Sequence, residues 1–257
     1  MSPAIKNTNI YLLEIPFTTN GKADTLWPVI IQHGQEYILV DCGYPGQLEL
    51  LEKAAREQGI DLQYLTGLIL THHDIDHVGA AAELKQKYPN IQVIAPVIEA
   101  PYISGKRKSL RLIQAEASLK YLNEEQKPFA LQFIKFLQSV VPVQVDKKLQ
   151  MSDTLWSTIQ VVPTPGHTPG HISLYIPSQK ILIAADAIVV ENNKLNIANP
   201  QYCLDLEQAV HSVALLSQYE IAELICYHGG RFRGNIQEAF KQVLHEYNNV
   251  MKTPINL

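Results

Sequence analysis

Residues 71–79 have the sequence THHDIDHVG, the most informative stretch of the chain. Three imidazoles and two carboxylates fall within these nine residues, and each can bind a divalent metal ion. They directly follow the apolar run 67–70 (GLIL), which has the pattern of a short buried strand. Sheets of this kind place their binding sites at the carboxyl ends of strands. The stretch therefore predicts a metal site on a loop at a sheet edge.

The surrounding pattern predicts two coarsely similar halves, each with strands first and a helix after. By itself the pattern indicates only an α/β or α+β class. Strands are expected at residues 10–15, 29–33, 36–40, 67–70, 92–95, 159–162, 171–176, 181–184 and 223–227, and helices at 46–58, 77–88, 205–218 and 235–247.

Residues 101–143 have a different hydrophobic pattern, with two helical segments in succession and no strand signal. We interpret the chain as a single domain, 1–257, with a helical insertion at about 101–143. The insertion carries a basic group, which we interpret as a solvated face rather than an anion-binding lid: Lys106, Arg107, Lys108 and Arg111.

The composition of the chain argues against several classes of protein. Charged residues make up 18% of the 257 residues, and the net charge of -4 is spread along the chain, so nothing indicates a nucleic-acid surface. No segment has the ~20 consecutive apolar residues that span a bilayer, and the first residues lack the features of a secretory signal. The 3 cysteines are widely spaced and odd in number, which argues against a disulfide framework. We expect a cytoplasmic protein that acts on a small molecule, with no nucleic-acid or membrane partner.

Three later positions supply further metal ligands at the ends of expected strands. They are His167 in a Pro-Gly-His-Thr context, Asp186 after strand 181–184, and His228 after strand 223–227. One metal site takes three or four protein ligands, so these residues and the 71–79 loop could fill two sites.

This succession resembles the metallo-β-lactamase superfamily. That family has a His-x-His-x-Asp-His run after a strand, a His in Pro-Gly-His-Thr, an Asp at a strand end and a last His near a Gly, and all four occur here in that order. The resemblance covers nearly the whole chain. It implies the α+β class and a four-layer αββα sandwich, with the site between the edges of two sheets.

The resemblance also implies the ligands of two divalent ions, for which zinc is expected and iron or manganese stay open. The first ion is assigned to His72, Asp74 and His167, the second to Asp76, His77 and His228, and Asp186 is shared between them. Asp74 stands where the family has a His, and its carboxylate should harden the first site and favour iron or manganese somewhat more. His73 is the alternative to Asp74, but we favour a role for it behind the ligands or at the surface. Asp41 matches a family residue that supports the metal loop by hydrogen bonds.

The chemistry that follows is hydrolysis. A metal-bridging hydroxide would attack the substrate, with Asp76 or Asp186 orienting it or taking its proton. Neither a Gly-x-Ser-x-Gly elbow nor a glycine-rich phosphate loop is present. The layout looks most like lactonases, esterases and glyoxalase-II-type thioesterases, which implies cleavage of a carboxylic ester, lactone or thioester. An iron-dependent oxidoreductase or dioxygenase of the same fold, or a ligand-sensing protein without activity, are the alternatives.

Overall fold

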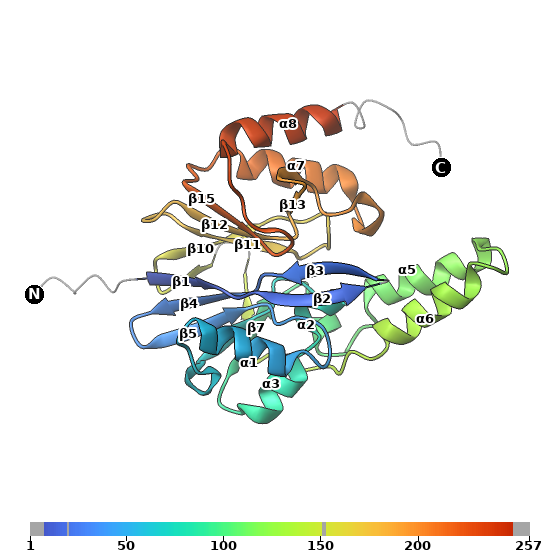
Figure 1. Cartoon of the computed structure of the whole chain (residues 1–257), viewed down its shortest axis with the longest axis horizontal. Coiled ribbons are helices and arrows are strands. Elements are labelled where there is room, and N and C mark those ends of the chain that lie inside the picture. The colour runs from blue at the N-terminus through green and yellow to red at the C-terminus, as the bar shows by residue number, and fades with distance from the viewer. Residues whose placement is uncertain (1–7, 20, 151–152, 249–257) are drawn as a thin grey trace, which may run out of the picture. The chain divides into compact units, whose positions relative to one another are not determined.

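The computed structural model describes residues 8–19, 21–150 and 153–248, and its elements are labelled in Figure 1. The chain forms two compact units. The first comprises residues 1–15 and 28–148, and the second comprises residues 16–27 and 149–257.

The first unit is built on a six-stranded sheet. Its order is β1 (Thr8–Leu12), β4 (Val29–His33), β5 (Glu36–Val40), β6 (Gly67–Ile69), β7 (Gln92–Pro96) and β8 (Lys147–Leu149). Strands β5, β6 and β7 run parallel, so the loops that follow them leave from the same edge. All three residues of β6 are buried, as its apolar run predicts. The edge next to β5 and β6 therefore carries Asp41 beside the 71–79 loop.

Helices α1 (Leu48–Glu57), α2 (Ile75–Val78) and α3 (Ala81–Lys87) and the 3-10 turn Leu62–Tyr64 complete this part of the unit. The single helix predicted over 77–88 is wrong, because the backbone breaks at Gly79 and Ala80. Gly79 packs so closely on Pro45 that an added Cβ would lie 2.3 Å from the Pro45 nitrogen. The break separates α2, which carries Asp76 and His77, from α3.

The region after β7 is helical, as predicted. It contains α4 (Ala100–Ile103), α5 (Leu110–Ser118), the 3-10 turn Leu119–Tyr121 and α6 (Lys127–Leu137). Figure 1 shows α5 and α6 lying side by side. We call residues 100–137 the helical segment.

The second unit contains another six-stranded sheet. Its order is β16 (Gly230–Arg231), β15 (Glu223–Cys226), β12 (Ile181–Ala185), β11 (Ile172–Ile176), β10 (Ile159–Pro163) and β9 (Thr154–Leu155). Strand β12 pairs with β15 in parallel, so their carboxyl ends also share an edge. Helices α7 (Leu206–Leu216) and α8 (Ile236–Asn248) pack on this sheet, with Phe240, Val213 and Leu224 all 0% exposed in the shared core.

Two small hairpins were not predicted as such. The strand expected at 10–15 is divided between β1 and a new strand β2 (Ile15–Thr19), which pairs with β3 (Lys22–Leu26). The second hairpin joins β13 (Val189–Glu191) to β14 (Lys194–Asn196) through Asn192 and Asn193, whose φ values are 50° and 61°. Its strands are three residues long and half exposed, too short for a period-2 pattern to stand out.

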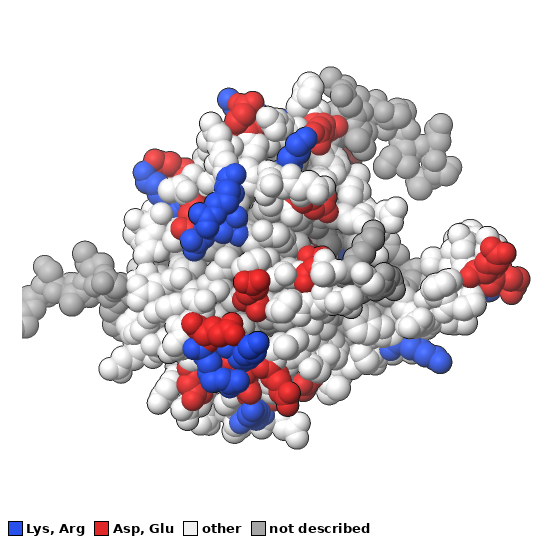
Figure 2. Space-filling model, viewed as in Figure 1, with Lys and Arg blue, Asp and Glu red and all other residues white. Residues whose placement is uncertain are grey.

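Acidic and basic side chains are intermixed on the face in Figure 2. Helix α1 gives an example of such pairing, with the ion pairs Lys53–Glu57 at 3.8 Å and Arg56–Glu52 at 4.0 Å. Among the described residues, no helix is long and apolar enough to cross a membrane.

Candidate metal centre

Asp41 organises the metal-binding loop of the first unit. It follows β5 with a φ of 59° and is 1% exposed. One carboxylate oxygen, Oδ1, accepts the Thr71 backbone N–H at 2.8 Å, and the other, Oδ2, accepts the Thr71 hydroxyl at 2.8 Å. Oδ2 also lies 2.8 Å from Nδ1 of His77. The hydrogen-bonding role predicted for Asp41 is confirmed.

These contacts fix which ring nitrogen of each histidine carries the proton. A carboxylate can only accept, so His77 donates from Nδ1, and its Nε2 carries the lone pair. The Thr71 hydroxyl uses its hydrogen on Asp41, so it accepts from Nδ1 of His72 at 3.0 Å. Both buried imidazoles therefore present an Nε2 lone pair that could bind a metal ion.

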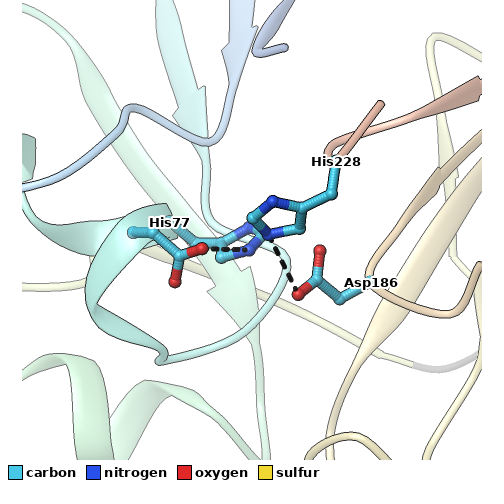
Figure 3. A group of neighbouring side chains, drawn as sticks. His77, Asp186 and His228 are labelled. Carbon is cyan, nitrogen blue, oxygen red and sulfur yellow. Dashed lines mark ion pairs between the residues drawn. The ribbon is translucent and has the colours of Figure 1, made fainter. Parts of the chain in front are cut away.

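The two Nε2 atoms each lie near a carboxylate of the same loop. Nε2 of His72 is 3.9 Å from Oδ2 of Asp74, and Nε2 of His77 is 3.6 Å from Oδ2 of Asp76. His77 is labelled in Figure 3. The first unit thus brings together the four ligands predicted from residues 71–79.

His73 has different partners, and they explain its place in the loop. It is 5% exposed, so the alternative of a surface role is wrong. Its backbone N–H donates to Oε2 of Glu99 at 3.1 Å, its Nδ1 contacts the same oxygen, and its ring stacks on Tyr102 with centroids 4.6 Å apart. Its Nε2 accepts the Leu110 backbone N–H at 3.3 Å. Both ring nitrogens of His73 are engaged within the first unit, in contacts that tie the loop to the helical segment.

Arg111 lies in a different environment from the solvated face that the sequence predicted. Lys106, Arg107 and Lys108 are exposed as predicted, but Arg111 is 4% exposed, so a solvated position is wrong for it. Its guanidinium donates to Oδ2 of Asp74 at 2.7 Å. The side chain turns inward because it lies four residues before Ala115, on the apolar stripe of α5.

The second unit brings together its own three predicted ligands. His167 lies in the Pro-Gly loop after β10, Asp186 directly follows β12, and His228 follows β15. Oδ2 of Asp186 is 3.5 Å from Nε2 of His167 and 3.5 Å from Nε2 of His228, and the second of these ion pairs is drawn in Figure 3. One carboxylate oxygen thus faces two imidazoles, an arrangement suited to a ligand shared between two ions.

His171 holds Asp186 in place. Its Nε2 accepts the Asp186 backbone N–H at 3.1 Å, so Nδ1 carries the proton and donates to the Thr164 hydroxyl at 2.8 Å. Ser173 lies 3.0 Å from that hydroxyl and donates onward to the Ala184 carbonyl. His171 is 0% exposed, and its contacts give it a structural role in this unit.

Gly166 lets the His167 loop approach α7. Its φ is 129°, and an added Cβ would lie 2.2 Å from the Ala209 nitrogen. The Asp205 N–H donates to the Gly166 carbonyl at 2.9 Å, and the Leu204 N–H to that of His167 at 3.2 Å. The residues before α7 therefore fix the backbone of this loop.

The thiols do not contribute a nucleophile. Burial, and secondly the charge of Asp41, raise the pKa of Cys42 well above its usual range. Burial, followed by the charge of Asp186, raises the pKa of Cys226 as well. Both thiols stay protonated at neutral pH and are fully buried, whereas Cys203 is half-buried.

The donor sets fit a divalent metal ion. Asp76 and His77 in the first unit, and Asp186 with each of His167 and His228 in the second, offer ligand atoms within 4.8 Å of each other. Imidazole nitrogen and carboxylate oxygen suit zinc, iron and manganese. Each unit thus carries a His/Asp cluster that could hold a metal ion.

A chain with helices and two six-stranded sheets, each with a His/Asp cluster that could hold a metal ion, has an α+β fold. The family model described as the metallo-beta-lactamase superfamily matches residues 27–228. The chain is a member of the metallo-β-lactamase superfamily.

Similar proteins support this membership. The probable metallo-hydrolase YflN of Bacillus subtilis is 23% identical over 237 residues, which cover 88% of this chain and 81% of that protein. A hydroxyacylglutathione hydrolase of Xanthomonas euvesicatoria is 35% identical over 95 residues, covering 35% of this chain and 34% of that protein. A metallo-beta-lactamase family protein of Thermus thermophilus has a similar crystal structure, with a TM-score of 0.71 and 20% identity over 93% of this chain and 79% of that one. The predicted fold class, the α+β metallo-β-lactamase sandwich, is confirmed.

Proposed function

We propose that this protein is a metal-dependent hydrolase that cleaves a carboxylic ester, lactone or thioester bond of a small molecule. The observation that carries the proposal is the pair of buried His/Asp clusters, in which hydrogen bonds direct Nε2 of His72 and His77 away from their supports. Membership of the superfamily supports it, and so do relatives whose names denote metallo-hydrolases.

We propose that the two clusters together hold two divalent ions in one centre. His72, Asp74 and His167 would bind the first, Asp76, His77 and His228 the second, and Asp186 both. The 3.5 Å distances from Oδ2 of Asp186 to two imidazoles favour the shared role. Bound ions of this kind supply a Lewis acid for a carbonyl oxygen and lower the pKa of water towards neutrality.

Asp76 and Asp186 are our candidates for handling the proton. The side chain of Asp76 is 14% exposed, the most accessible carboxylate of the loop, so it can contact a water or a substrate. Asp186 is held by its backbone N–H on His171, which leaves its carboxylate oriented towards the imidazoles. These residues would orient the attacking water and accept its proton.

The proposal also specifies the class of bond that is cleaved. The name of the Xanthomonas relative denotes hydrolysis of hydroxyacylglutathione, which is a thioester, so thioesters head the substrates to be tested. The iron-dependent oxidoreductase alternative was suggested by the extra negative charge of Asp74. The Arg111 contact balances that charge and removes the argument for this alternative.

The experiment is a hydrolysis panel on zinc-loaded protein with an S-acyl glutathione, a γ-lactone and a phenyl ester. Asp186→Asn should lower kcat at least ~100-fold, because it removes a proposed shared ligand. The control is Asp61→Asn, since an exposed Asp that caps a 3-10 turn can be replaced by Asn. Full activity of Asp186→Asn, or no hydrolysis of any substrate by the metal-loaded wild type, would overturn the proposal.

A further inference from the structure

Asp74 contacts a buried cation, the guanidinium of Arg111. Its Oδ2 lies 2.7 Å from the Arg111 guanidinium and 3.9 Å from Nε2 of His72. Asp74 is 7% exposed and Arg111 is 4% exposed, so solvent screens their charges only weakly. The oxygen that faces the His72 imidazole is therefore already paired with a positive charge.

The guanidinium is fixed by its surroundings. A second nitrogen of Arg111 donates to Oε1 of Gln114 at 2.8 Å, one turn further along α5. The first residue of α5, Leu110, donates its backbone N–H to His73 in the metal-binding loop. Because the helix start and the guanidinium are both anchored, Arg111 cannot withdraw from Asp74 without breaking these contacts.

His72 and His77 therefore differ in the charges that surround them. His77 is backed by the Asp41 carboxylate, which increases the basicity of the imidazole and attracts a cation. His72 is backed by the neutral Thr71 hydroxyl, and its carboxylate neighbour Asp74 is paired with Arg111. A divalent ion that used Asp74 would lie only a few ångströms from the guanidinium, whose repulsion offsets the attraction of the carboxylate.

We propose that Arg111 is a built-in counter-cation of Asp74 that weakens divalent-metal binding on the His72 side of the loop relative to the His77 side. The inference rests on the metal centre of the proposed function and ranks its two metal sites by affinity. It also replaces the expectation that Asp74 makes the first site more negative: the Asp74–Arg111 pair is close to neutral, as an imidazole is.

The test is a Zn²⁺ titration of the metal-free protein against a competing chelator, with stoichiometry by native mass spectrometry. Wild type should show two classes of site, the weaker at least ~10-fold lower in affinity. Arg111→Gln should strengthen the weaker class about tenfold or more, because Asp74 is then released to the metal. Asp74→Asn should weaken it further, and the double variant, in which both charges are absent, should return towards wild type.

Two arginine variants serve as controls. Arg111→Lys keeps the charge and should resemble wild type. Arg107→Gln removes an exposed charge from the same segment and should also leave both affinities unchanged. An Arg111→Gln protein whose weaker class is unchanged or weakened would overturn the proposal, because Arg111 would then only hold Asp74 in position.

Two further single variants, which keep Arg111, cover the case in which Arg111→Gln fails to fold. His72→Ala should abolish the weaker class, and His77→Ala should abolish the tighter one. Two sites of equal affinity in wild type, or the reverse assignment, would contradict the inference while leaving the metal centre intact. Absence of zinc binding in wild type would instead overturn the metal centre itself and this inference with it.

Discussion

Oδ2 of Asp41 accepts a hydrogen bond from Nδ1 of His77 at 2.8 Å, and the same carboxylate binds the backbone and hydroxyl of Thr71. Both carboxylate oxygens of Asp41 accept hydrogen bonds, but Asn has only one oxygen. In Asp41→Asn the amide NH₂ must therefore face an N–H or O–H group of Thr71 or His77, which is itself a donor. We expect about 2–3 kcal/mol less stability and a zinc affinity lowered about 10–100-fold. Urea unfolding of the metal-free protein and a zinc titration measure the two effects separately. Asp61→Asn is the control, and wild-type affinity in Asp41→Asn would show that this hydrogen bond does not support the ligand.

His171 should act on the centre only through Asp186. His171→Gln removes the ring that links the Asp186 backbone N–H to Thr164 in a fully buried position. We expect a loss of about 1–3 kcal/mol in the free energy of unfolding, because these polar groups lose their partner. The number of zinc ions bound per chain, measured by elemental analysis, should stay the same. Loss of one ion would mean that His171 itself is a ligand.

Gly79 should tolerate no side chain. In Gly79→Ala the new Cβ would overlap the backbone of Tyr44 and Pro45 at 2.3–2.4 Å, two residues after the proposed ligand His77. We expect about 2–3 kcal/mol of destabilisation from this overlap, with a reduced zinc affinity. Gly46→Ala in the adjoining turn is the comparison, since nothing lies within 4 Å of its added Cβ and only its φ of +81° costs about 1 kcal/mol. Equal stabilities of the two variants in thermal unfolding would show that the loop moves freely away from this turn.

The thiols give a test that does not involve metal. Burial raises the pKa of Cys42 and Cys226, so both should resist a disulfide reagent in the native protein. Half-buried Cys203 should react first, and all three should react in urea. Mass spectrometry of the labelled peptides identifies the modified residue. Rapid labelling of Cys42 in native protein would indicate that the edge next to β5 opens.

Local patterns in the sequence predict much of the fold. Strands β4 and β5 have the predicted bounds, because each contains a run of apolar residues and the short turn Gly34-Gln35 separates them. The candidate ligands could be located for a related reason, since they lie in segments that follow buried strands with easily recognised apolar runs.

Contacts between distant residues could not be predicted in this way. Asp74 meets Arg111 across 37 positions, and His73 meets Glu99 across 26, because the helical segment folds back on the metal-binding loop. Arg111 also lies close to three exposed basic residues, which made a solvated face the simplest interpretation. Its position four residues before Ala115 in α5 is a signal in the sequence that points inward.

We propose that the two His/Asp clusters form one centre for two divalent ions. Native mass spectrometry of metal-free protein after reloading with Zn²⁺ tests it most directly, with Asp186→Asn measured beside wild type. The proposed centre should bind two zinc ions per wild-type chain and fewer than two in Asp186→Asn at the same free zinc concentration. Less than one ion per wild-type chain under zinc-replete conditions would contradict it.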